Sequence, residues 1–258
     1  MHALVRFLAA LLLAAGLSSA AAAQVFSVRD IAVDETAPTI QQAIEQGRAK
    51  ARLTAAQRLV EKLTLAEDRA QANPALDYPA LARLVISTDF QAEEKRTASR
   101  YITTLIMRFN ADEVRSFLET RGVPFVEAQA GRTLLVPSVS QQDVAAWARA
   151  WDGKADATRL TPFVVSRATY DRPLRWADVE AETIAQQAAR AVVAEAYNQD
   201  GGVFVRLTEL RAGAPAEVLA VAGPFSSLAA AQAGAIDAME TAYKRAVVVR
   251  TTGQTSMD

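Results

Sequence analysis

Two neighbouring segments that are dense in β-branched and aromatic residues place the strongest constraint on how this chain can fold. They read "LVISTDFQA" and "SRYITTLIMRF", and only the short charged stretch "EEKRTA" separates them. A connection of this length is typical of a β-hairpin, so we predict two antiparallel strands. Side chains alternate between the two faces of a strand. We therefore expect the helices to cover the face of the second strand that carries Tyr101, Leu105, Met107 and Phe109.

A long helix is predicted before the hairpin and a shorter one after it. Thr39 and Gln42 match a capping pattern, and Asn110, Glu113 and Gly122 mark the start and end of the second helix. The apolar positions of the first helix recur every three or four residues and form one stripe. They are Ile40, Ile44, Gly47, Ala51, Ala55, Leu59 and Leu63, while Arg48, Lys50, Arg52, Arg58 and Lys62 lie mostly off this stripe.

The predicted order of elements is the same in the two halves of the chain. In the first half, a strand at 25–34 precedes the long helix, the hairpin and the second helix, and short strands follow at 124–128 and 132–139. In the second half we predict a strand at 161–170, an alanine-rich helix at about 178–197, a hairpin from 201–210 and 216–223, a helix at about 226–243 and a strand at 245–251. The expected fold is therefore α+β, with two consecutive βαββαβ-like units whose antiparallel or mixed sheets carry their helices on one face.

These elements suggest a division of the chain into five parts. They are a signal peptide at 1–23, an N-terminal domain at 24–139, a helix through Trp147 and Trp151 with a linker at 140–160, a C-terminal domain at 161–250 and a disordered tail at 251–258.

The first 23 residues have the pattern of a secretory signal peptide. Arg6 precedes an apolar run from Phe7 to about Leu17, and Ala21 and Ala23 provide the small residues of a cleavage site. The run is shorter than the roughly 20 apolar residues of a membrane span. We expect a mature chain that begins at Gln24, is periplasmic and has no transmembrane segment.

The mature chain would lack two residue types that much enzyme chemistry needs. The sequence has no cysteine, and its single histidine is His2, inside the predicted signal peptide. This composition excludes disulfides, thiol nucleophiles, Ser–His triads and metal sites that need imidazole or thiolate ligands. We expect no cofactor and no metal site. Loss of Arg6 with the signal peptide leaves 27 basic against 29 acidic residues, which argues against nucleic acid as a partner.

A catalytic alternative rests on carboxylates alone. Asp89, Glu93 or Glu94 could act with a second acid across a groove, as in glycosidases. Glu93 and Glu94 are adjacent on an extended chain, however, and point to opposite sides. We expect them to form a solvated hairpin tip. A second alternative, a small-molecule carrier, would need an apolar pocket between the two halves.

Several segments of the first half resemble a known family. They are "FSVRDIAVDETA", "QGRAKARLTAAQRLVEKLT", "LVISTDFQAEEKRTASRYITTLIMRFNADEVRSFLETRGVPF" and "LLVPSV", within Phe26 to Val139. Together with the signal peptide they are similar to an uncharacterised envelope family of Gram-negative bacteria, domain of unknown function family 2066. The resemblance implies export and a fold, and it brings no catalytic residues.

The function expected from the sequence is a non-catalytic interaction or assembly role in the cell envelope. The partner would be another envelope protein or a cell-wall component. The candidate contact residues are those of the basic helix face and the hairpin: Arg48, Arg52, Arg96, Arg100 and Tyr101.

Overall fold

The computed structural model describes residues 24–140 and 142–254. The predicted signal peptide and the last four residues of the predicted tail lie outside this range. The chain divides into two compact units, Met1–Ala128 and Gln129–Asp258. Both units combine helices with antiparallel or mixed sheets, so the α+β class is confirmed.

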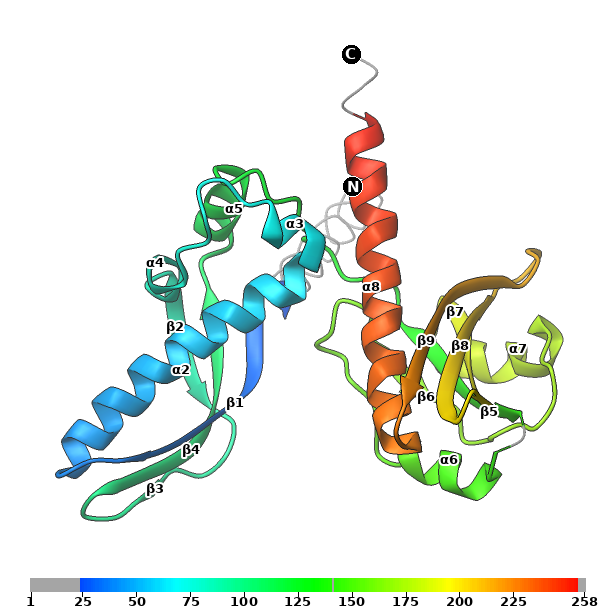
Figure 1. The fold of residues 1–258 in the computed structure, drawn as a ribbon, viewed down its shortest axis with the longest axis horizontal. Coiled ribbons are helices and arrows are strands. Elements are labelled where there is room, and N and C mark those ends of the chain that lie inside the picture. Colours follow the sequence, from blue (N-terminus) through cyan, green and yellow to red (C-terminus); the bar gives the residue numbers. More distant parts are fainter. Residues whose placement is uncertain (1–23, 141, 255–258) are drawn as a thin grey trace, which may run out of the picture. The chain divides into compact units, whose positions relative to one another are not determined.

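The first unit is a small antiparallel sheet with one long helix across it (Figure 1). Its strand order is β1-β4-β2, and the short strand β3 also pairs with β4. The elements in chain order are β1 (Ser27–Thr36), α2 (Ile40–Leu63), α3 (Ala66–Ala70), α4 (Tyr78–Ala82), β2 (Val85–Phe90), β3 (Lys95–Arg96), β4 (Arg100–Phe109) and α5 (Ala111–Glu119).

The predicted hairpin and its buried face are confirmed. Strands β2 and β4 pair in antiparallel register, with Asp89 opposite Ile106. Alternate residues of β4 are buried, and they include the four that were expected to face the helices. Helix α2 begins at the predicted cap, where the Thr39 side chain accepts a hydrogen bond from the Gln42 N–H.

Helix α2 lies very close to the sheet at Gly47. A Cβ atom at this position would lie 2.7 Å from Cγ1 of Val33 and 3.4 Å from Cδ1 of Tyr101. Glycine therefore permits the close approach of helix and strand in the middle of the buried stripe. Asn110 caps the start of helix α5 as predicted, and Gly122 has a positive φ of 65° just beyond its end.

The second unit is a mixed five-stranded sheet of order β6-β5-β7-β8-β9. Strand β5 runs parallel to both β6 and β7, and the other neighbours are antiparallel. The elements in chain order are β5 (Thr133–Ser140), α6 (Val144–Trp151), β6 (Phe163–Val165), α7 (Trp176–Ala185), β7 (Arg190–Gln199), β8 (Gly202–Leu210), β9 (Glu217–Phe225) and α8 (Leu228–Gln254).

Helices cover both faces of this second sheet. Trp147 and Trp151 of α6 and Met239 of α8 belong to a hydrophobic cluster with one set of sheet residues, which includes Val192. Val179 of α7 belongs to a different cluster with Leu134, Val136, Ala191, Val193 and Leu210. The prediction of helices on one face is therefore wrong for this unit. Its element order also differs from that of the first unit, so the two halves are not repeats of one βαββαβ arrangement.

The boundary between the units lies earlier than the predicted end of the first domain at 139. Strand β5 is paired on both sides within the second sheet, so it cannot end the first unit. Helix α6 was assigned to a linker, but its two tryptophans are buried in the second core. The predicted strand at 124–128 is irregular instead, with the Val126 N–H bonded to the Leu63 carbonyl.

Three predicted elements of the second unit differ from the structure. The expected helix at 178–197 is the shorter helix α7 followed by the central strand β7, because pairing with β5 and β8 on both edges outweighs the helix propensity of its alanines. The expected strand at 245–251 continues helix α8, which ends at Gln254, inside the predicted tail. The strand expected at 161–170 is confined to Phe163–Val165.

Candidate functional site

Most of the basic residues on the predicted contact face of α2 are held by partners within the first unit. Lys50 forms an ion pair of 2.7 Å with Glu35. Arg58 donates to the Asp30 carbonyl, and Lys62 donates to two carbonyls near the start of the unit. These side chains tie the helix to β1 and are not a free basic surface.

Arg48 and Arg96 are brought together by Glu94 in the hairpin loop. Glu94 pairs with Arg96 and lies 4.0 Å from Arg48. Its Oε1 and the Tyr101 hydroxyl are buried, and neither atom makes a hydrogen bond of ordinary geometry among the described residues. Burial opposes ionisation of Glu94, but the nearby Tyr101 hydroxyl and the two arginines outweigh it and lower the pKa of this carboxyl. This Glu94 cluster holds the hairpin tip against α2.

Tyr101 and Arg100 do not form a shared contact surface. The Tyr101 side chain is fully buried, chiefly by its position under α2, and burial together with Glu94 raises the pKa of its phenol. Arg100 points elsewhere and makes two hydrogen bonds of 2.8 and 2.7 Å to Asp34. The prediction of Tyr101 as a contact residue therefore disagrees with its burial.

Arg52 is the member of the predicted set that lines a groove. The groove lies between α2, α4 and the start of β2, has a volume of about 510 Å³ and is formed by Ala49, Arg52, Leu53, Pro79, Ala82, Arg83 and Val85. Among the residues that the structure describes, neither Arg52 nor Arg83 forms an ion pair. We call this hollow the β2 groove; it combines an apolar floor with two available cations.

The strand beside this groove is an edge strand with exposed apolar side chains. Within the described part of the chain, β2 pairs with β4 on one side and with no strand on the other. Ile86 is 68% exposed and Phe90 is 52% exposed. The register puts Phe90 opposite Leu105, so Phe90 lies on the face of the sheet that α2 covers. An apolar surface therefore continues from the β2 groove along this edge.

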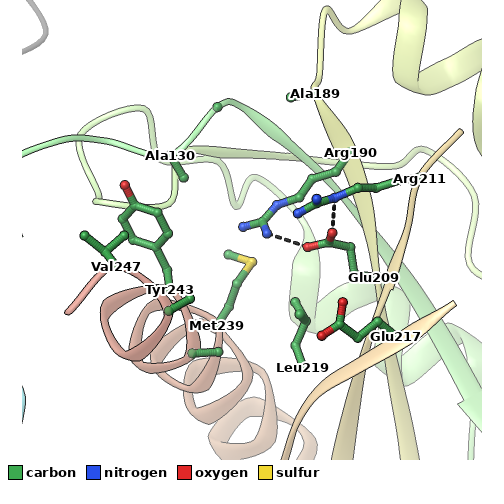
Figure 2. Close-up of a pocket in the computed structure, with 13 residues that line it drawn as sticks. Ala130, Ala189, Arg190, Glu209, Arg211, Glu217, Leu219, Met239, Tyr243 and Val247 are labelled. Carbon is green, nitrogen blue, oxygen red and sulfur yellow. Dashed lines mark hydrogen bonds and ion pairs between the residues drawn. The ribbon is translucent and has the colours of Figure 1, made fainter. Parts of the chain in front are cut away.

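The second unit contains a pocket of about 460 Å³ between α8 and the sheet (Figure 2). One wall is polar and comes from the strands: Arg190 from β7, Glu209 from β8, Arg211 just beyond β8 and Glu217 from β9. The other wall comes from α8 and includes Met239, Ala242, Tyr243, Ala246 and Val247. We call this the α8 pocket.

Glu209 organises the polar wall. Its side chain is only 4% exposed, and each of its oxygens is taken by an arginine. Oε2 accepts from Nη1 of Arg190 at 2.5 Å, and Oε1 accepts from Nε of Arg211. Arg190 is fixed further because its Nε donates to Oγ1 of Thr133. Figure 2 shows both guanidinium groups meeting at the carboxylate.

Glu217 is the second carboxylate of the pocket and lies beside Glu209. The two residues are directly opposed in the register of β8 and β9, so their side chains project from the same face. Glu217 is exposed and makes no ion pair or hydrogen bond with the described residues.

The α8 pocket meets part of the expectation for a hydrolase that works through carboxylates, but not its essential part. Two carboxylates line one pocket and one of them is buried. Both oxygens of Glu209 are occupied by arginines, however, which leaves one available carboxylate where such a mechanism needs two. In the hairpin, Asp89 is paired with Arg108 at 2.6 Å and Glu94 is held by its own cluster.

No group of three or more His, Cys, Asp or Glu side chains among the described residues is arranged to hold a metal ion. None of the helices within these residues has the length and apolar character needed to cross a bilayer.

Sequence reasoning missed most residues of both hollows. Arg83 directly precedes the predicted hairpin, and Ile86 and Phe90, beside the β2 groove, lie in its first strand. Large apolar residues on an edge strand were a usable signal for this surface. Arg190 was assigned to the predicted helix at 178–197, so its position at the start of strand β7 was not recognised. Glu209, Arg211 and Glu217 flank a predicted hairpin connection, where charged residues are normally solvated.

Comparison with protein-family models finds no match for this chain, and comparison with curated proteins finds no significant relative.

Proposed function

We propose that this protein is an exported, periplasmic and non-catalytic interaction protein of the cell envelope. Its first unit binds an extended, acidic segment of another envelope protein along the free edge of β2, with side chains of that segment in the β2 groove. The observation that carries this proposal is the position of two available arginines, Arg52 and Arg83, beside an unpaired strand edge.

The edge of β2 supports the choice of an extended occupant. An unpaired edge strand offers a row of backbone N–H and C=O groups that another strand can complete. β2 has few of the protections that edge strands usually have, because it contains no proline or lysine and exposes Ile86 and Phe90. An added strand would cover these two side chains.

The charge of the groove supports the choice of an acidic occupant. Four of the five basic residues of α2 form ion pairs or hydrogen bonds within the first unit, and Arg52 is the exception. Arg83 of the α4 end adds a second cation to the same groove. A carboxylate of the partner would pair with these two arginines, and its apolar side chains would cover the exposed Ala49, Leu53 and Pro79 beside them.

Export is proposed from the N-terminal sequence pattern and from the resemblance to the envelope family. The mass of the protein purified from the periplasm tests it directly. We expect a chain that starts at Gln24, and recovery of the uncleaved chain in the cytoplasm would contradict the proposal.

Charge reversal tests the docking surface. The partner is first identified by crosslinking in intact cells, and a synthetic peptide of its crosslinked segment is then titrated against the purified protein. We expect Arg52→Glu with Arg83→Glu to weaken peptide binding at least tenfold, because the double variant replaces two attractive contacts by repulsive ones. Both side chains lack ion-pair partners among the described residues, so the melting temperature should stay the same.

Arg29→Glu provides the matched control. Arg29 is also an exposed arginine of the first unit without an ion pair in the described part of the chain, and it lies on β1 outside the groove. Its reversal should leave binding unchanged. Equal loss in the control and the double variant, or a crosslinked segment that is basic or belongs to a cell-wall polymer, would refute the proposed docking mode.

A further inference from the structure

We propose that the α8 pocket of the second unit binds a small zwitterion with an apolar side chain, of the class of free apolar amino acids and short apolar peptides. This site is separate from the β2 groove, and it is formed entirely by residues of the second unit.

The arginines supply donors for the carboxylate of such a ligand. Arg190 uses Nε and Nη1, and Arg211 uses Nε, for the contacts with Thr133 and Glu209. Nη2 of Arg190 and both Nη groups of Arg211 are left without partners among the described residues. A guanidinium group binds a carboxylate through paired N–H groups. Two guanidinium groups at one wall of a pocket are therefore well suited to a terminal carboxylate.

Glu209 prepares these donors before any ligand arrives. An ionised carboxylate that is 4% exposed is costly unless it is paired, and here two arginines pair with it. The same contacts fix the orientation of both guanidinium groups. Less side-chain freedom is then lost on binding, which favours affinity.

Glu217 supplies the complementary site for an ammonium group. It lines the same pocket, lies directly across from Glu209 in the strand register and has no ion-pair partner among the described residues. With two arginines and two glutamates, the formal charge of the polar wall is zero. A zwitterion preserves this balance, whereas a simple anion or a simple cation would leave the pocket with an uncompensated charge.

The opposite wall selects an apolar side chain. Leu219 of β9 and Met239, Ala242 and Val247 of α8 present carbon and sulfur atoms to the cavity. Figure 2 shows Met239 and Tyr243 across the cavity from the arginines. The volume of about 460 Å³ lies within the roughly 300–1,000 Å³ of typical small-ligand pockets.

Calorimetric titration of the full mature chain with L-leucyl-L-leucine tests the proposal. We expect saturable binding at one site per chain. Three analogues each remove one feature: N-acetyl-L-leucyl-L-leucine lacks the ammonium group, L-leucyl-L-leucinamide lacks the carboxylate and glycylglycine lacks the apolar side chains. Each analogue should bind at least tenfold more weakly than the parent dipeptide.

Two variants connect the binding to this pocket. Arg211→Gln should weaken dipeptide binding at least tenfold, and Glu217→Gln should do the same while leaving the affinity for the N-acetylated dipeptide unchanged. Arg206→Gln is the matched control, because Arg206 pairs with Glu195 on the opposite face of the same sheet. Circular dichroism melting curves verify that the variants are folded.

Three outcomes would overturn the inference. They are no binding of the dipeptide or of free L-leucine to the folded protein, an affinity that is the same in Arg211→Gln and Arg206→Gln, and N-acetylated dipeptide binding as tight as that of the parent. Loss of peptide docking at the β2 groove would not affect these results, since the two sites share no residue.

Discussion

The two units of this protein use a long helix and a sheet in different ways. In the first unit α2 lies on one face of a small sheet, and its basic side chains other than Arg52 contact the neighbouring strand and hairpin. In the second unit helices cover both faces of a five-stranded sheet, and buried clusters lie on each side. The first unit therefore has its candidate site on an edge, and the second has its candidate site under a helix.

The difference shows how core construction determines the type of site. A sheet with two covered faces can enclose a pocket and orient buried charges, as Glu209 does with Arg190. A sheet with one covered face leaves its other face in contact with solvent, and ion pairs such as Asp34–Arg100 and Asp89–Arg108 keep that face polar. The exposed apolar residues of β2, Ile86 and Phe90, differ from this polar surface.

The largest expected effect comes from removing an anchor of the second core. Trp147 is fully buried, packs edge-to-face on Trp151 at 5.4 Å and donates from Nε1 to the Ala194 carbonyl at 3.1 Å. Trp147→Ala should lower the free energy of unfolding by about 3–5 kcal/mol. Hydrogen exchange should show faster exchange in β7 and unchanged protection in β4. Equal loss of protection in both strands would contradict the separation of the two cores.

A smaller effect is expected at the closest helix contact of the first unit. In Gly47→Ala the added methyl group would lie 2.7 Å from Val33. Overpacking costs about 1–3 kcal/mol, and the higher helix propensity of alanine offsets up to about 1 kcal/mol. We therefore expect a net loss of stability. Urea denaturation measures this loss, and faster hydrogen exchange of the β4 amides locates it in the first unit. Gln46→Ala, at an exposed neighbour on the same helix, should not be destabilising.

The Glu94 cluster is expected to make the stability of the first unit depend on pH. The folded pKa of Glu94 lies below its ordinary value of 4.5, so its contribution is present above that pH and is lost as the pH falls through the lowered pKa. Glu94→Gln should cost about 1 kcal/mol at neutral pH and flatten this acid dependence. Melting temperatures between about pH 3 and 7 measure both effects. An unchanged acid profile in the variant would show that Glu94 does not stabilise the hairpin.

The smallest effect is expected at the exposed pair of Asp34 and Arg100. The hydrogen bond from Arg100 lowers the pKa of Asp34, but both side chains are about half exposed. Exposed ion pairs contribute little because water and salt screen them. Asp34→Asn should leave the melting temperature at neutral pH unchanged. A clear destabilisation would mean that the uncovered sheet face is part of the core.

The sequence predicted the first unit better than the second for a physical reason. One face of β4 is covered and the other is not, so its residues alternate in the period of two that reveals a strand. Strand β7 is buried on both faces between two helical layers, and its small residues show no such alternation. Its alanines then favoured a helix prediction that only the pairing with β5 and β8 corrects.

The candidate sites were predictable only in part. The basic face of α2 was recognised, but the sequence could not show that Arg48, Lys50 and Arg58 have partners while Arg52 has none. The distinction depends on contacts between residues far apart in the chain. The α8 pocket could not be predicted without the register of three strands. Arg190, Glu209 and Glu217 come together only when β7 pairs with β8 and β8 pairs with β9.

Site-specific photo-crosslinking in intact cells tests the proposed docking edge most directly. A photoreactive phenylalanine analogue at Phe90 is compared with the same analogue at Val221 of β9, because these apolar side chains are 52% and 54% exposed on the two units. The proposal predicts one crosslinked envelope protein from position 90, lost with Arg52→Glu and Arg83→Glu, and none from position 221. No crosslink from position 90, or the same crosslink from both positions, would contradict the assignment of the β2 edge as the docking surface.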